Sequence, residues 1–163
     1  MELVGVRLEV PANAPVMMLR EQTGQRRLLP IYIGNPEAAA IHYAVEGIVP
    51  ARPLTHDLFR DVLATLGAEV EQVVVTEMRE HTYFAELHVR TAGAQHVVSA
   101  RPSDAIALAV RIGCPIFATD EVLEQGGQVE EVAGDDDGEG DEEQILADFQ
   151  DFIAHITPDD FAE

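Results

Sequence analysis

The chain has 163 residues, nearly half of them apolar, which is enough for one domain with a hydrophobic core. Its formal net charge is -20, but residues 1–129 hold 16 acidic residues against 10 arginines, whereas residues 130–163 hold 14 acidic residues and no basic one. Residues 1–129, which we call the body, are mildly acidic and contain no lysine. This composition argues against tight nucleic-acid binding through many phosphate contacts. No apolar run reaches 18 residues, so no membrane span is expected.

The N-terminus and the cysteine content predict a cytoplasmic protein. Residues 1–10 lack the basic start and apolar stretch of a signal peptide. The single cysteine, Cys114, has no partner for a disulfide within the chain, which fits a reducing compartment. We expect Cys114 to be a small buried side chain rather than a nucleophile.

The first part of the body is predicted to form three strands and a helix. Apolar runs predict strands over residues 3–10, 16–21 and 26–34, with a glycine-containing turn between the last two. A helix is expected from Pro36 to Glu46, because proline suits a first helical turn and a glycine follows the helix as a stop.

A second helix is predicted directly afterwards. Thr55 is expected to cap its N-terminus, and Gly67 to end it. Apolar residues recur at helical spacing and share one face. They are Leu58, Phe59, Val62, Leu63 and Leu66.

The second part of the body repeats this order of elements. Strands are predicted over residues 69–78, 82–90 and 95–100, then a helix begins near Pro102. A short strand at 114–118 and a short helix at 119–127 follow.

An offset of 66 residues aligns the two parts, placing Pro36 on Pro102 and Gly47 on Gly113. This indicates an internal duplication. The sequence therefore predicts an α+β fold: a compact domain with a duplicated strand-strand-helix pattern and a mostly antiparallel or mixed sheet packed with helices. The two helix starts, at Glu37 and Asp104, should face one shared groove.

The helix after Pro102 has a polar start and an apolar body. No polar residue occurs from Ala105 to Val110, so this helix should be buried on nearly all sides. Arg101, Ser103 and Asp104 stand at its start. These side chains either complete the helix end or form a site.

The composition changes after residue 129. We predict three regions: a folded domain over 1–129, an acidic flexible linker over 130–141, and an amphipathic helix with a tail over 142–163. The apolar stripe of that helix needs a core, a sister subunit or a separate partner to bury it. Its members are Ile145, Leu146, Phe149, Phe152, Ile153 and Ile156.

Three segments together resemble the bifunctional nuclease family. They are LLPIYIGNPEAAAI, ARPLTHDLFRDVLATLGAEVEQVVV and SARPSDAIALAVRIGCPIF, and the resemblance covers about residues 2–126. It implies a compact α+β domain with the duplicated pattern and, for some members, cleavage of both DNA and RNA. The acidic segment with a final helix is similar to the tail of actinobacterial members.

The resemblance also implies which residues form the site. The family motif residues in this sequence are Glu37, Arg52, Thr55, His56, Asp57, Arg101, Ser103 and Asp104. The sequence departs from the family pattern at Tyr32, where tryptophan is common, at Ser99, where aspartate is frequent, and at His81, where a turn glycine is usual.

We assign roles to these residues as a hypothesis for metal-dependent hydrolysis of phosphodiester bonds with low sequence preference. His56 would be the general base, while Asp57, Asp104 and Glu37 would be catalytic and would hold Mg²⁺ or Mn²⁺. The substrate-binding residues would be Arg52, Thr55, Arg101 and Ser103, the two arginines clamping phosphate.

Each role has a structural alternative. Thr55 and Asp57, like Ser103 and Asp104, are residues that helix starts favour without any chemistry. Arg101 could simply pair with Asp104 or Glu37 inside the fold.

An alternative function is a non-enzymatic binding or regulatory module, whose C-terminal amphipathic helix recruits a protein partner. The apolar helices further predict a homo-oligomer, most simply a dimer, because a small domain has little surface with which to cover them. Expected partners are therefore nucleic acid, a second copy and a protein bound by residues 142–163, but no membrane.

Overall fold

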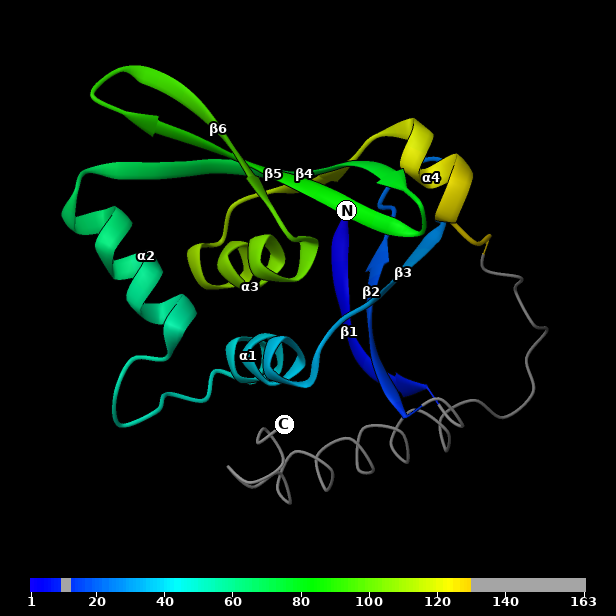
Figure 1. The fold of residues 1–163 in the computed structure, drawn as a ribbon, viewed down its shortest axis with the longest axis horizontal. Coiled ribbons are helices and arrows are strands. Elements are labelled where there is room, and N and C mark those ends of the chain that lie inside the picture. The colour runs from blue at the N-terminus through cyan, green and yellow to red at the C-terminus, as the bar shows by residue number, and fades with distance from the viewer. Residues whose placement is uncertain (10–12, 130–163) are drawn as a thin grey trace.

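A computed structural model of the chain describes residues 1–9 and 13–129 (Figure 1). The predicted linker over 130–141 and the helix over 142–163 lie outside these residues. The described part is an α+β fold of two sheets and four helices, as the sequence predicts. None of its helices is both long and apolar enough to cross a membrane.

The first sheet is antiparallel and has the order β1-β2-β3. Its strands are β1 (Glu2–Glu9), β2 (Ala14–Arg20) and β3 (Leu28–Tyr32). An ion pair of 3.0 Å between Glu21 and Arg27 closes the connection between β2 and β3. The central strand is the most buried of the three, which matches its almost continuous apolar sequence.

The second sheet has the order β6-β5-β4-β7. It consists of β4 (Ala68–Arg79), β5 (Thr82–Thr91), β6 (Ala94–Ala100) and the short β7 (Ile116–Ala118), which runs parallel to β4. Two-residue turns with positive φ join β4 to β5 and β5 to β6, as a right-twisted hairpin requires. The outer strand β6 is exposed along nearly its whole length.

The helices are α1 (Asn35–Val45), α2 (Thr55–Thr65), α3 (Pro102–Ile112) and α4 (Asp120–Gly126). Figure 1 shows α3 at the centre, with α1 on one side and the second sheet on the other. Every residue from Ala105 to Ala109 is buried, which confirms the prediction of a helix buried on nearly all sides. Its position places the polar start of α3 beside α1 and α2.

The predicted duplication agrees with the order of elements. Each part has three antiparallel strands followed by a helix with proline in its first turn: β1-β2-β3-α1 and β4-β5-β6-α3. The two helices α1 and α3 pack against each other. The starts of both helices are therefore close in space, as the sequence predicts.

One expectation about α2 is wrong, and one feature of this helix was not predicted. Thr55 does not cap this helix: Leu54 is the N-cap, and the Asp57 carboxylate accepts its backbone N–H at 3.0 Å. The apolar face of α2 is also largely exposed, with Leu63 alone packed against the core. The sequence suggested a dimer because a small domain has little surface with which to cover its apolar helices. This reason does not hold for α3, because α1 and the second sheet cover it within one chain.

Candidate functional site

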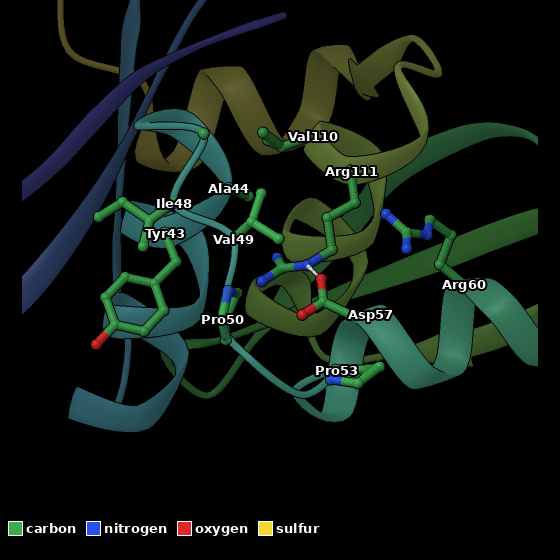
Figure 2. A pocket seen from close by; sticks show the side chains of 11 residues that line it. Tyr43, Ala44, Ile48, Val49, Pro50, Pro53, Asp57, Arg60, Val110 and Arg111 are labelled. Atoms are coloured by element: carbon green, nitrogen blue, oxygen red, sulfur yellow. Dashed lines mark hydrogen bonds and ion pairs between the residues drawn. The ribbon is translucent and has the colours of Figure 1, made fainter.

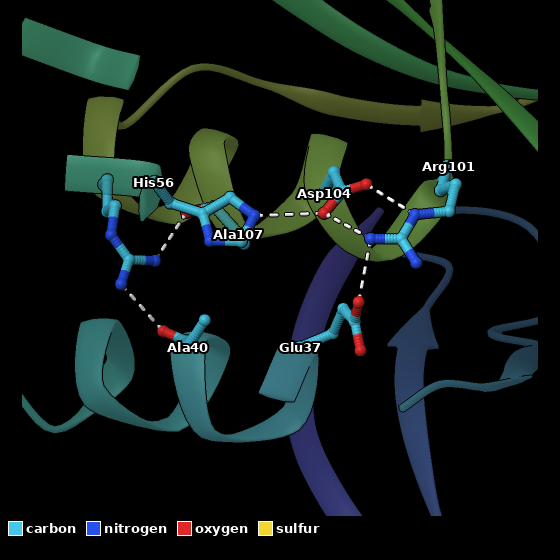
Figure 3. Close-up of polar contacts among 7 residues, drawn as sticks. Glu37, Ala40, His56, Arg101, Asp104 and Ala107 are labelled. Atoms are coloured by element: carbon cyan, nitrogen blue, oxygen red, sulfur yellow. Dashed lines mark hydrogen bonds and ion pairs between the residues drawn. The ribbon is translucent and has the colours of Figure 1, made fainter. Parts of the chain in front are cut away.

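Three helices bring four of the predicted site residues into one hydrogen-bonded network (Figure 3). His56 Nε2 lies 3.1 Å from Asp104 Oδ1. Arg101 donates to the same carboxylate from Nε at 2.7 Å and from Nη2 at 3.1 Å. Nη2 also donates to Glu37 Oε1 at 2.8 Å. The network therefore joins residues up to 67 positions apart in the sequence, from Glu37 to Asp104.

Local helix geometry explains the position of each side chain. Arg101 is the extended N-cap of α3, and Asp104 lies in the first turn, so an i,i+3 pair forms across the helix start. Glu37 lies in the first turn of α1 after its proline. His56 is in the first turn of α2 and points toward α3, as Figure 3 shows.

The electrostatics of the network favour the charged forms of Asp104 and Arg101. Burial by itself would raise the pKa of Asp104, but the hydrogen bonds from Arg101 and His56 outweigh burial and lower this pKa. The hydrogen bonds to Asp104 and then Glu37 raise the pKa of Arg101. The Asp104 carboxylate is consequently an ionised acceptor at neutral pH.

Arg101 is the exposed member of the network. Its side chain is 66% exposed, and those of His56 and Glu37 are mostly covered. Its Nη1 has no hydrogen-bond partner among the described residues, so donors remain for a ligand from solvent. An anion can therefore approach Arg101 without breaking its bonds to Asp104 and Glu37.

The predicted site residue Asp57 belongs to a different cluster. Its Oδ1 accepts a 2.6 Å hydrogen bond from Arg111 Nε, and its Oδ2 accepts the Leu54 N–H. Burial raises the pKa of Asp57, but the bonds from Arg111 and Leu54 have the larger combined effect, so the pKa is lowered. Both oxygens thus have partners within the fold, and a chemical role for Asp57 stays a prediction.

Arg111 is the residue that the sequence reading missed. Its side chain is only 4% exposed, and its other donors reach the carbonyls of Ala107 and Ala40 at 2.9 Å. It therefore connects α1, α2 and α3. The available signal was a lone arginine in the last turn of a helix otherwise expected to be buried, since a buried arginine needs a partner.

The remaining predicted residues are not joined to the network. Arg52 is exposed in the loop before α2 and makes no ion pair with the described residues. Thr55 is exposed at the first position of α2. Ser103 is buried in the first turn of α3. These positions leave the predicted substrate contacts of all three residues untested.

A pocket of about 310 Å³ is lined in part by the Asp57–Arg111 pair (Figure 2). Its walls come from the end of α1, the following loop, α2 and α3. Asp57, Arg60 and Arg111 supply its charged groups, and its other lining side chains are mostly apolar. His56 does not line this pocket, so the pocket is not the entrance to the histidine.

The described side chains do not fit a ready-made metal site. Within residues 1–9 and 13–129, no three His, Cys, Asp or Glu side chains form a group that could hold a metal ion. Glu37 and Asp104 approach each other through Arg101, whose guanidinium occupies the space where a shared cation would bind them.

The geometry defines an α+β domain with a histidine–carboxylate–arginine network at the meeting point of three helix starts. A family model described as bifunctional nuclease domain matches residues 17–131. The chain belongs to this family.

Two groups of relatives are similar to the chain over different lengths. It is 42% identical to the uncharacterized protein Rv1829 of Mycobacterium tuberculosis over 162 residues, covering 98% of this chain and 95% of that protein. It is 34% identical over 108 residues to "Bifunctional nuclease 1" of Arabidopsis thaliana, and 31% identical over 116 residues to "Bifunctional nuclease 2" of rice, Oryza sativa subsp. japonica. These alignments cover 64% and 69% of this chain but only about a third of each plant protein.

Proposed function

We propose that the chain is a nuclease that hydrolyses phosphodiester bonds of DNA, RNA or both with low sequence preference. The observation that carries this proposal is the contact of His56 with Asp104 beside an exposed arginine that keeps free donors. The family match and the names of the plant relatives support the same reaction class.

The proposed roles follow from the contacts. Arg101 binds a phosphate oxygen through Nη1, because Nε and Nη2 are already held by carboxylates. Asp104 orients the His56 ring through Nε2, which leaves Nδ1 to accept a proton from the attacking water. Glu37 positions Arg101. Contacts to phosphate carry no sequence information, so the expected sequence preference is low.

A requirement for Mg²⁺ or Mn²⁺ is a separate part of the proposal. To bind Asp104 or Glu37, the ion would have to displace Arg101 from that carboxylate. The candidate ligands are Asp104 and Glu37, and Asp57 could join them only if Arg111 and the Leu54 N–H released it. Adding each metal, and removing metals with EDTA, measures this requirement directly.

The test is cleavage of end-labelled single-stranded DNA and RNA by the purified full-length chain, with EDTA, Mg²⁺ or Mn²⁺. We expect cleavage by the wild type and at least a 100-fold lower rate for His56→Ala, the range typical of lost general-base catalysis. His88→Ala is the matched control, because His88 also lies next to a carboxylate, Glu86, but on the second sheet. Undiminished cleavage by His56→Ala would refute the proposed site.

A second candidate function is a binding or regulatory module that uses residues 142–163 to recruit a protein. The favouring observation is that the alignment with the mycobacterial protein covers 98% of this chain, whereas the family match ends at residue 131. The double variant Phe149→Asp/Phe152→Asp of the full chain should then lose a partner that the wild type captures from cell extract. Identical capture by both would count against recruitment by this segment.

The cytoplasmic location and the homo-oligomer are also proposals. A lone, partly buried free cysteine agrees with a reducing compartment. Fractionation of the producing cells tests the location.

A further inference from the structure

The outward face of α2 is an apolar surface that nothing in the described chain covers. The side chains of Leu58 and Leu66 are 58% and 73% exposed, and Phe59 and Val62 are about two-fifths exposed. Their spacing of three and four residues places them along one side of the helix. We call these four residues the α2 stripe. It contains no charged side chain.

The α2 stripe adjoins the side of α2 that holds the helix on the domain. Leu63 packs against the core, and His56 and Asp57 bond to α3. On a helical projection at 100° per residue, Leu63 lies only about 40° from Phe59, and Leu58 lies on the edge of the stripe farthest from Leu63. The stripe is therefore the exposed continuation of one wide apolar face, of the kind that packs against another helix.

We propose that a second copy of this chain covers the stripe, with α2 packed antiparallel against α2 of the other copy across a twofold axis near Val62. A twofold axis brings the same patch of both copies together, so an uncharged stripe meets an uncharged stripe. Residues 1–129 carry a net charge of -6 (16 acidic residues against 10 arginines), and contact through the stripe brings together no like charges of the four stripe residues.

The exposed area agrees with a dimer of ordinary size. From the exposed fractions, the stripe offers roughly 400 Å² of apolar surface per copy, so two copies would bury roughly 800 Å². Since about 60% of a protein interface is apolar, this corresponds to a total of roughly 1,300 Å². That total lies within the range of stable, specific interfaces, at its lower end.

The other candidate occupant of the stripe is the segment over 130–163 of the same chain. A stripe covered by that segment would leave the wild type monomeric in the measurement below.

Sedimentation velocity of the full-length chain between about 1 and 100 µM, the weak end of the affinities that such interfaces show, tests the proposal. We expect wild type at twice the 17.8 kDa chain mass, and Phe59→Glu at the monomer mass. Phe117→Glu is the matched control: Phe117 is 46% exposed against 43% for Phe59, but it lies on β7, so this variant should stay dimeric. Circular dichroism establishes that each variant is folded.

A cross-linking measurement tests the antiparallel geometry and does not depend on a variant that dissociates. In a Cys114→Ser background, Leu58→Cys and Leu66→Cys chains are mixed and oxidised with copper phenanthroline. Antiparallel packing predicts cross-links between the two variants in excess of those within either one. A monomeric wild type at 100 µM, dimeric Phe59→Glu, or cross-links chiefly between identical variants would each overturn the proposal.

Discussion

Replacing Asp57 with alanine should destabilise the domain strongly, because it leaves the buried charge of Arg111 without its partner. The ion pair measures 2.6 Å, and the Arg111 side chain is 4% exposed. Breaking a buried pair from one side costs about 3–5 kcal/mol. The Leu54 N–H also loses its acceptor at the start of α2, a contact worth about 1 kcal/mol.

We therefore expect Asp57→Ala to lower the free energy of unfolding by about 4 kcal/mol, and the melting temperature by roughly 10–15 °C. Urea and thermal denaturation followed by circular dichroism measure both quantities at neutral pH.

Asp61→Ala is the matched control on the same helix. Its 2.7 Å pair with Arg60 is exposed, so its loss should cost less than about 1 kcal/mol. Equal losses for the two variants, or a loss below about 1 kcal/mol for Asp57→Ala, would refute the reasoning that burial makes the Arg111 pair important.

Three further predictions concern other parts of the domain. His81 has a φ of 62° in the turn between β4 and β5, so His81→Gly should raise the free energy of unfolding by about 0.5 kcal/mol in urea denaturation; a decrease would contradict this. The lowered pKa of Asp104 means that its stabilising effect is fully present above the ordinary carboxyl pKa of about 4 and is lost as the pH falls through the lower folded value. Asp104→Asn should consequently reduce the loss of stability between pH 6 and pH 3, and an unchanged pH dependence would contradict the assignment. Burial raises the pKa of Cys114, so iodoacetamide should alkylate it at least about tenfold more slowly in the folded chain than in urea, as mass spectrometry would show; equal rates would mean an exposed thiol.

The elements of the fold were accessible from the sequence because their signals are local. Periodicity, glycine and proline placed each strand and helix within a few residues of its observed bounds. The uninterrupted apolar run from Ala105 to Val110 correctly indicated a helix buried on nearly all sides. The repeated order of elements correctly brought the starts of α1 and α3 together.

The division of the polar residues into two clusters was not accessible in this way. His56 and Asp57 are adjacent in the sequence, but on a helix neighbouring side chains point about 100° apart. One therefore reaches Asp104 and the other reaches Arg111. The spacing of residues in the sequence does not determine how α2 is rotated about its own axis relative to α3, because that rotation depends on how the two helices pack.

The cap of α2 was mispredicted, and the exposure of its apolar face was not predicted, for a related reason. Thr55 and Asp57 both suit a helix start, and the observed start uses the carboxylate two residues later in place of the threonine hydroxyl. An apolar stripe is likewise the same in a sequence whether a core or another molecule covers it.

The central claim is that His56 and Asp104 act together in phosphodiester cleavage. A double-mutant cycle on kcat/KM for a labelled single-stranded substrate tests it most directly, using wild type, His56→Ala, Asp104→Asn and the double variant. Because Asp104 also holds Arg101, the double variant should be slower than His56→Ala, but by a much smaller factor than Asp104→Asn costs when His56 is present. Losses that multiply in the double variant, or a His56→Ala chain with the wild-type kcat/KM, would contradict the account.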